Sequence, residues 1–177
     1  MHEAAYVHWS CRRRGAALGT RGAGATISLV EAQSEGQRSG VAVMTKLLAA
    51  IDEAHLRRAF AEMVDAKVGA VLMSTSASFI AQRALIVELG AKHRLPVIYA
   101  FRQSVEEGGL MAYGPDLGEL AKRLALSVQQ ILGGTKASDI PIHQPTKFEL
   151  VINLQTAKAL GLTVPQSVLA QADEVIE

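Results

Sequence analysis

The sequence predicts an α/β protein in which helices cover both faces of a parallel sheet. From about Val41 onward, short apolar segments rich in β-branched residues alternate with segments whose apolar residues recur at helical spacing. Near-continuous apolar strands separated by amphipathic helices are typical of a buried parallel sheet with right-handed crossover connections. The 177 residues are enough for one domain with a full core. We therefore expect a three-layer arrangement of helices, sheet and helices.

The first forty residues differ from the rest and are expected to be partly mobile. Three consecutive arginines, Arg12–Arg14, are followed by closely spaced glycines, and no strand is recognisable in this part. A tail up to about Ala25 and a short helix over about Ser28–Arg38 are the simplest interpretation. The sequence thus divides into an atypical N-terminal segment, 1–40, and a main domain, 41–177.

Four apolar segments are predicted to be strands. Three of them are short and nearly continuous, as in strands buried on both faces, and the last alternates apolar with polar residues. They span Val41–Leu48, Gly69–Met73, Pro96–Ala100 and Phe148–Asn153.

Three longer segments have the apolar spacing of amphipathic helices. Their apolar faces are Leu56, Phe60, Met63 and Val64; Ile80, Ala84, Val87 and Ala91; and Leu117, Leu120, Leu124, Val128 and Ile131. The third helix has clear ends, because Asp116 and Glu119 form a capping-box pattern and Gly133-Gly134 stands where a helix must stop. A short helix around Leu154–Leu160 and a helical tail after Pro165 are expected to follow.

The composition indicates a globular protein that does not bind nucleic acid. Hydrophobic residues make up 49% and charged residues 20%, which is typical of a folded chain. The net charge of +1 gives no reason to expect nucleic acid or an anionic membrane surface as a partner. Cys11 is the single cysteine, which excludes an internal disulfide framework. No membrane-spanning run and no secretory signal are recognisable, so we expect a soluble protein, cytoplasmic if Met1 is the true start.

The first candidate ligand-binding residues follow the strand that ends at Met73, because ligands of open parallel sheets bind beyond the carboxyl ends of the strands. Ser74, Thr75 and Ser76 come directly after this strand and lead into a helix. Their hydroxyls, with the free backbone N–H groups at the helix start, could hold an anion such as a ligand carboxylate. The alternative is that one of these residues only caps the helix.

Aromatic residues and an arginine follow the next strand. Tyr99, Phe101 and Arg102 lie at its end and Tyr113 comes soon after, in a chain with only 5% aromatic residues. We predict that these side chains form a wall of a pocket and that Arg102 pairs with an acidic group of the ligand. The alternatives are that Tyr99 and Phe101 pack in the core and that Arg102 is solvated.

Glycines before the third predicted helix form a third candidate region. Gly108 and Gly109 allow close backbone approach or a positive φ, and a chain crossing between two lobes could also need them. The alternative is a turn followed by a capped helix, which explains Gly114–Asp116.

Motifs of enzymes and of metal sites are absent. The sequence has no G-x-G-x-x-G that opens a helix after a strand, no Walker loop, no G-x-S-x-G and no H-E-x-x-H. The five histidines are scattered without the spacing of metal ligands. Cys11 lies beside arginines in a segment expected to be mobile, so we interpret it as an incidental free thiol. We therefore expect no catalytic residue, no metal and no cofactor.

Several stretches match the pattern of one known family. Gly108–Asp116 reads GGLMAYGPD, and Ile131–Ile142 follows the pattern ILKG-x-K-P-x-D-L-P-V. Gln144–Pro165 is the strongest match, and Ala170–Glu177 ends the chain as the family ends. These stretches resemble the ABC-transporter substrate-binding family related to the tryptophan-binding TrpX-type proteins. The similarity covers about 41–177.

The resemblance implies a periplasmic-binding-protein type I fold, in which two Rossmann-like lobes close on a small solute. The solute is commonly an amino acid or a similar carboxylate, and the part that matches here is the C-terminal lobe. The loops Ser74–Ser76 and Tyr99–Arg102 are then expected to face the cleft. The implied mechanism is closure on the solute and presentation of the closed form to a membrane permease, without covalent chemistry.

The chain also departs from the family. A signal peptide, an N-terminal lobe and the first strand of the C-terminal lobe are not recognisable before Val41, and Ser74–Ser76 replaces a loop that often carries an acidic residue and a proline. The resemblance implies a solute-binding component, or isolated lobe, that works in the periplasm with an ABC permease if exported. The alternative is a truncated cytoplasmic regulatory or interaction module. A homodimer is a further hypothesis, because a lobe without its partner exposes cleft surface.

Overall fold

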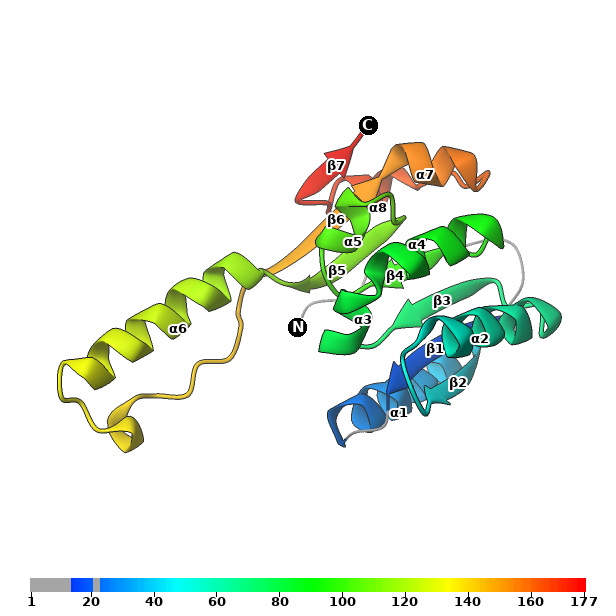
Figure 1. Ribbon diagram of the computed structural model, residues 1–177. Helices are drawn as coiled ribbons and strands as arrows, with labels where there is room; N and C mark the ends of the chain where they lie inside the picture. Colours follow the sequence, from blue (N-terminus) through cyan, green and yellow to red (C-terminus); the bar gives the residue numbers. More distant parts are fainter. Residues whose placement is uncertain (1–13, 21–22) are drawn as a thin grey trace.

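The computed structural model describes residues 14–20 and 23–177. Its strands are β1 Arg14–Thr20, β2 Ala42–Leu48, β3 Ala70–Met73, β4 Val97–Tyr99, β5 Met111–Pro115, β6 Phe148–Asn153 and β7 Glu174–Ile176. Its helices are α1 Ala23–Arg38, α2 Glu53–Asp65, α3 Ala77–Ala81, α4 Arg83–Lys92, α5 Gln103–Glu106, α6 Leu117–Leu132, α7 Leu154–Ala159 and α8 Gln166–Leu169, with a 3₁₀ turn at Ala137–Asp139. Figure 1 shows a layered α/β body from which α6 projects.

The described strands form one seven-stranded sheet of order β2-β1-β3-β4-β5-β6-β7. Strands β1 to β5 are parallel, so the predicted α/β class with a mainly parallel sheet is confirmed. Strand β6 is the exception, because it pairs antiparallel with β5. The segment 117–147 leaves the sheet after β5 and returns to the same edge, so the next strand has to run backwards. A sequence pattern of alternating strands and helices does not reveal such a return.

Strand β1 corrects the expectation of a mobile tail reaching about Ala25. Arg14–Thr20 lies between β2 and β3, and its residues Ala16, Ala17 and Leu18 are buried. The prediction missed this strand because small residues beside an arginine carry little β signal, although they suit a central, fully covered position. The tail predicted over residues 1–13 lies outside the described part of the chain. The predicted helix over about Ser28–Arg38 is confirmed, and α1 begins five residues earlier, at Ala23.

The main core lies where α2 and α4 pack against one face of the sheet. The predicted apolar face of α2 is confirmed at Leu56, Phe60 and Met63, which are buried, but Val64 is exposed. The face predicted for the next helix is mostly wrong, because only Val87 of its four residues packs against the core cluster. A break at Gln82 divides that segment into α3 and α4, which turns a different set of residues inward; these are Phe79, Ile86, Leu89 and Gly90.

The C-terminal elements agree with the prediction except at the end of the chain. Phe148–Asn153 is a strand, and α7 follows it directly. The helical tail expected after Pro165 ends at Leu169, and Glu174–Ile176 instead joins the sheet as β7. Among the described residues, no helix is both long and apolar enough to cross a membrane.

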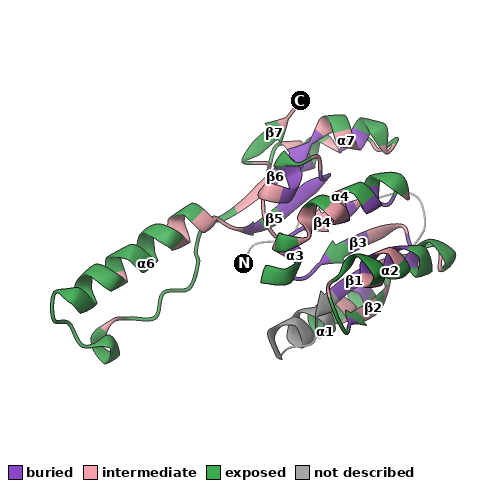
Figure 2. Ribbon diagram, viewed as in Figure 1, coloured by how far each residue is buried: buried purple, intermediate pink, exposed green. Residues whose placement is uncertain are grey.

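Helix α6 has the predicted ends. The carboxylate of Asp116 accepts hydrogen bonds from the N–H groups of Gly118 (2.9 Å) and Glu119 (3.1 Å), and Gly134 has a φ of +94° just beyond the helix. However, none of its residues is buried, and Figure 2 shows exposed positions along almost its whole length. The strong amphipathic signal of this segment therefore does not describe a contact with the core of this chain.

Candidate functional site

The sheet order places the candidate site at the carboxyl ends of β1, β3, β4 and β5. In doubly wound sheets of order 2-1-3-4-5, ligands bind where the strand order reverses, between the first and third strands. A cavity of about 150 Å³ opens at this point. It is lined by Ala17, Leu72, Met73, Ser74, Thr75, Tyr99, Ala100 and Tyr113.

Ser74 lies at the floor of this cavity with an unsatisfied hydroxyl. Its side chain is 9% exposed, and its N–H donates to the carbonyl oxygen of Leu18 at 2.9 Å. Its Oγ has no hydrogen-bond partner among the described residues. A buried hydroxyl left without a partner costs about 1–3 kcal/mol. The polar end of a small solute in the cavity would remove this penalty.

Ser76 and Thr75 continue the loop into α3. Ser76 is the N-cap residue of α3 with an extended backbone, but its side chain makes no capping hydrogen bond. The capping alternative therefore explains the position of Ser76 and leaves its hydroxyl unused by the helix. Ser76 lines a small cavity of about 20 Å³ that shares Ser74 and Tyr99 with the larger one. Thr75 is exposed at the rim of the larger cavity.

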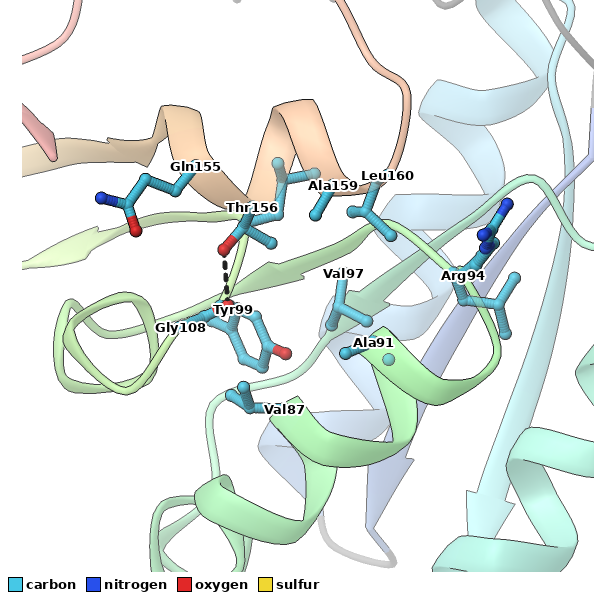
Figure 3. Close-up of a pocket in the computed structure, with 14 residues that line it drawn as sticks. Val87, Ala91, Arg94, Val97, Tyr99, Gly108, Gln155, Thr156, Ala159 and Leu160 are labelled. Atoms are coloured by element: carbon cyan, nitrogen blue, oxygen red, sulfur yellow. Dashed lines mark hydrogen bonds between the residues drawn. The ribbon is translucent and has the colours of Figure 1, made fainter. Parts of the chain in front are cut away.

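Tyr99 satisfies both alternatives, because it belongs to the main core and also lines the candidate cavity. Its hydroxyl does not serve this cavity. It points into a larger pocket of about 400 Å³ between α4 and α7 (Figure 3), where Gly90 faces it. Burial raises the pKa of Tyr99, so its phenol is neutral at physiological pH. The larger pocket lies by Leu95 and Leu110, which precede β4 and β5, and thus at the amino ends of these strands.

Tyr113 and Phe101 lie at two sides of the candidate site. Tyr113 is 60% exposed on the cavity rim and stacks on Phe148, with ring centroids 5.8 Å apart. This pair forms an exposed aromatic surface. Phe101 is half-buried and lines only the small cavity, together with Phe79 and Ile80.

Arg102 does not line either cavity, and it is not simply solvated. Its guanidinium contacts Glu106 at 2.9 Å, Glu149 at 3.2 Å and Glu174 at 2.5 Å. The hydrogen bonds that Arg102 donates to Glu106 and Glu174 raise its pKa, so it stays charged. The arginine joins α5, β6 and β7. Only Glu106, four residues along a helix, could have been expected from the sequence.

We expect Arg102→Met to destabilise the protein by about 1–2 kcal/mol at pH 7, because three carboxylates lose their common counterion. The loss should shrink in 1 M salt, because salt screens the attraction between the guanidinium and the carboxylates. Urea unfolding at low and at high salt measures this difference. Arg38→Met is the control, because Arg38 is largely exposed and pairs with Glu35 on the same helix. Equal losses for Arg102→Met at both salt concentrations would contradict the ion-pair explanation.

Gly108 and Gly109 were predicted to allow either a positive φ or a close backbone approach, and each of the two shows one of these features. Gly108 has a φ of +100°, while a Cβ on Gly109 would lie 2.6 Å from both the Ser104 oxygen and the Tyr99 ring. Gly114 is part of β5 and not of a turn, so that half of the alternative is wrong, while the capped helix after Asp116 is confirmed. A Cβ there would lie 1.8 Å from the backbone oxygen of Ala100. The close approach of Gly114 to Ala100 brings the ends of β4 and β5 together beside the cavity.

Hydroxyls, aromatic rings and aliphatic side chains line the candidate site, and among the described residues no carboxylate, histidine or cysteine lines it. In the part of the chain that the structure describes, no group of three or more His, Cys, Asp and Glu residues could hold a metal. The lining residues that the sequence analysis missed are Ala17, Leu72 and Met73, which carry no chemical signature.

Comparisons with known proteins agree with this fold. A family model described as ABC transporter substrate binding protein matches residues 24–176. The solved ABC domain in complex with L-Trp from Streptococcus pneumonia superposes with a TM-score of 0.79 at 23% identity, covering 92% of this chain and 56% of that one. A conserved domain protein from Vibrio cholerae has a TM-score of 0.80 at 21% identity, with coverages of 92% and 54%.

A curated relative gives a shorter match. The tyrosine-binding protein of Clostridioides difficile is 24% identical over 96 residues, which is 54% of this chain and 28% of the relative. The matched part thus covers little more than half of each of these two solved structures and less than a third of this relative.

Proposed function

The chain belongs to the ABC transporter substrate-binding protein family, and from this premise we propose that its cavity at the strand ends binds a small solute. This is a family of solute-binding proteins and not of enzymes. We assign the described part of 41–177, together with β1 and α1, to the C-terminal lobe of such a protein. The observation that carries the proposal is the unsatisfied Ser74 hydroxyl at the floor of a cavity at the switch point of the sheet.

The proposed solute is an amino acid with an aromatic side chain, or a related carboxylate. Ser74, Thr75 and Ser76 supply the hydroxyls for its polar end, and Tyr113 with Phe148 supplies an aromatic surface for its side chain. Two similar proteins, one bound to L-Trp and one named for tyrosine, support this class. Tyr99 closes the back of the cavity. Phe101 lines the small cavity beside it, and Arg102 holds α5, β6 and β7 together through its ion pairs. The cavity of about 150 Å³ holds only part of such a solute, so the rest is expected to meet a second surface.

The proposed mechanism is transport by binding. The lobe takes part in closure around the solute, and the closed form is recognised by an ABC permease in the membrane. Members of the family work outside the cytoplasm, and we place the encounter with the solute in the periplasm. A solute that binds the closed conformation more tightly than the open one shifts the population towards the closed conformation. The size of the shift is set by the difference between the two affinities.

A thermal-shift titration with L-tryptophan and L-tyrosine tests this proposal. At a solute concentration 100 times the Kd, the stabilisation of about 2.7 kcal/mol should raise the Tm by about 5–10 °C. Tryptamine, which lacks the carboxylate, and L-alanine, which lacks the ring, should give much smaller shifts. A cooperatively melting protein whose Tm is unchanged by every amino acid would rule the proposal out.

Ser74→Ala should change stability and affinity in opposite directions. Removing an unsatisfied buried hydroxyl should leave the free energy of unfolding unchanged or raise it by about 1 kcal/mol. Affinity for the solute should fall by about 10- to 150-fold, because one hydrogen bond to a charged group is lost. Calorimetric titration and urea unfolding measure the two effects. Ser78→Ala, at an exposed position of α3 outside the cavity, should change neither.

A further inference from the structure

The pocket of about 400 Å³ between α4 and α7 has no role in the proposed solute site. Leu95 and Leu110, which precede β4 and β5, line it, so it lies at the amino ends of these strands. The candidate solute cavity lies at their carboxyl ends, and of the described residues only Tyr99 lines both spaces. Pockets that hold small molecules commonly measure about 300–1,000 Å³. The pocket, here called the helix pocket, is therefore large enough for a ligand of its own.

The walls of the helix pocket are held in place by contacts within the chain. The hydroxyl of Thr156 donates a hydrogen bond to the carbonyl oxygen of Gly108 at 2.8 Å (Figure 3), and its N–H donates to the Oδ1 of Asn153 at 3.0 Å. These bonds fix the first turn of α7 beside the loop before β5. In the opposite wall, Gly90 leaves space on α4, because a Cβ there would lie 3.8 Å from the Tyr99 hydroxyl oxygen. The space thus exists without a ligand, as it does in most small-molecule sites.

The hydroxyl of Tyr99 is a polar group in the interior of the helix pocket. Tyr99 is only 5% exposed, and its hydroxyl points between α4 and α7 (Figure 3). It makes no hydrogen bond to any described residue. Because its phenol is neutral, it can donate a hydrogen bond as well as accept one. Buried polar groups are nearly always hydrogen-bonded, so the partner of this hydroxyl has to come from what fills the pocket.

The charge at the helix pocket is positive and the rest of its wall is mainly apolar. Arg94 lies at one end without an ion pair to a described residue, and Gln155 lies at the other end (Figure 3). Among the described residues, no carboxylate lines the pocket. Aliphatic side chains form much of the wall between the two ends; they include Val87, Leu95, Val97, Leu110 and Leu160. A guanidinium beside an aliphatic pocket suits an anion with an apolar body.

We propose that the helix pocket binds an aliphatic carboxylate with a second oxygen on its chain, such as a medium-chain hydroxy acid. Its carboxylate pairs with Arg94, its hydrocarbon chain lies along the aliphatic wall, and its chain oxygen accepts a hydrogen bond from the Tyr99 hydroxyl. An aliphatic chain fits better than a ring, because Tyr99 is the only aromatic residue among the described residues that line the pocket. This proposal does not depend on solute binding at the carboxyl ends of the strands.

Calorimetric titration of the full chain with β-hydroxyoctanoate tests the proposal, and one molecule should bind per chain. Arg94→Gln should weaken binding by about 5- to 10-fold, because the carboxylate loses its ion pair. Lys92→Gln is the matched control, since it removes a nearby positive charge from α4 outside the pocket and should leave the affinity unchanged. Ala159→Phe should abolish binding, because its ring occupies the pocket. Ala159 is exposed, so urea unfolding of this variant should match that of the wild type.

A second probe, octanoate, isolates the role of the Tyr99 hydroxyl. Tyr99→Phe should weaken β-hydroxyoctanoate by about 3- to 10-fold and octanoate hardly at all, because only the first has a chain oxygen for the phenol. Equal losses for both probes would overturn this assignment of the hydroxyl. The site itself would be wrong if β-hydroxyoctanoate showed no saturable binding, or if Ala159→Phe left its binding intact, since the probe would then occupy another part of the molecule.

Discussion

Replacing Gly114 with alanine is expected to lower the free energy of unfolding by about 3 kcal/mol or more. A Cβ at this position would lie 1.8 Å from the backbone oxygen of Ala100 and 2.9 Å from its carbonyl carbon. Both neighbours are backbone atoms, so relief requires β5 to move away from the end of β4. Urea unfolding followed by circular dichroism measures the loss.

The same change should remove solute binding in the fraction that remains folded. Ala100 and Tyr113, which flank the contact, both line the cavity at the strand ends. Gly15→Ala is the matched control, because Gly15 also lies in a strand but its Cβ would meet Ala70 and Val41 at an ordinary 3.8 Å. The control should change stability by no more than about 0.5 kcal/mol. A Gly114→Ala protein as stable as the control would show that β4 and β5 do not approach this closely.

The fold could be predicted wherever apolar patterning and burial agree, and not elsewhere. Strand β6 was predicted with its bounds because Phe148–Asn153 combines alternation with β-branched residues. Strand β1 was missed because Ala16 and Ala17 reach the core through their position between two strands and not through their own hydrophobicity. The antiparallel direction of β6 depends on where the segment 117–147 returns, which is a property of topology.

The sequence predicts which loops form the candidate site, but not which of their side chains face the cavity. The rule that ligands bind beyond the strand ends selects Ser74–Ser76 and the residues after β4 from the sequence alone. Which of these side chains face the cavity depends on the backbone of each loop. The chain turns Ser74 inward and directs Arg102 to glutamates 47 and 72 residues away. Pairs so distant in sequence carry no local signal.

Helix α2 offers a direct comparison between patterning and structure, because two of its apolar residues have opposite environments. Phe60 is 0% exposed and stacks on His93 with ring centroids 6.3 Å apart, whereas Val64, four residues on, is 40% exposed. Periodicity assigns both residues to one buried face. Their different burial predicts very different contributions of the two side chains to the free energy of unfolding.

We expect Phe60→Ala to cost about 3–5 kcal/mol, since it removes a buried ring and leaves a cavity between α2 and the sheet. Val64→Ala should cost no more than about 1 kcal/mol, because its side chain is only partly buried and alanine favours the helix. Urea unfolding of the two variants under the same conditions measures both values. Similar costs would mean that α2 is rotated about its axis relative to this structure. The packing of α2 against β2 and α4 would then differ from the packing described above.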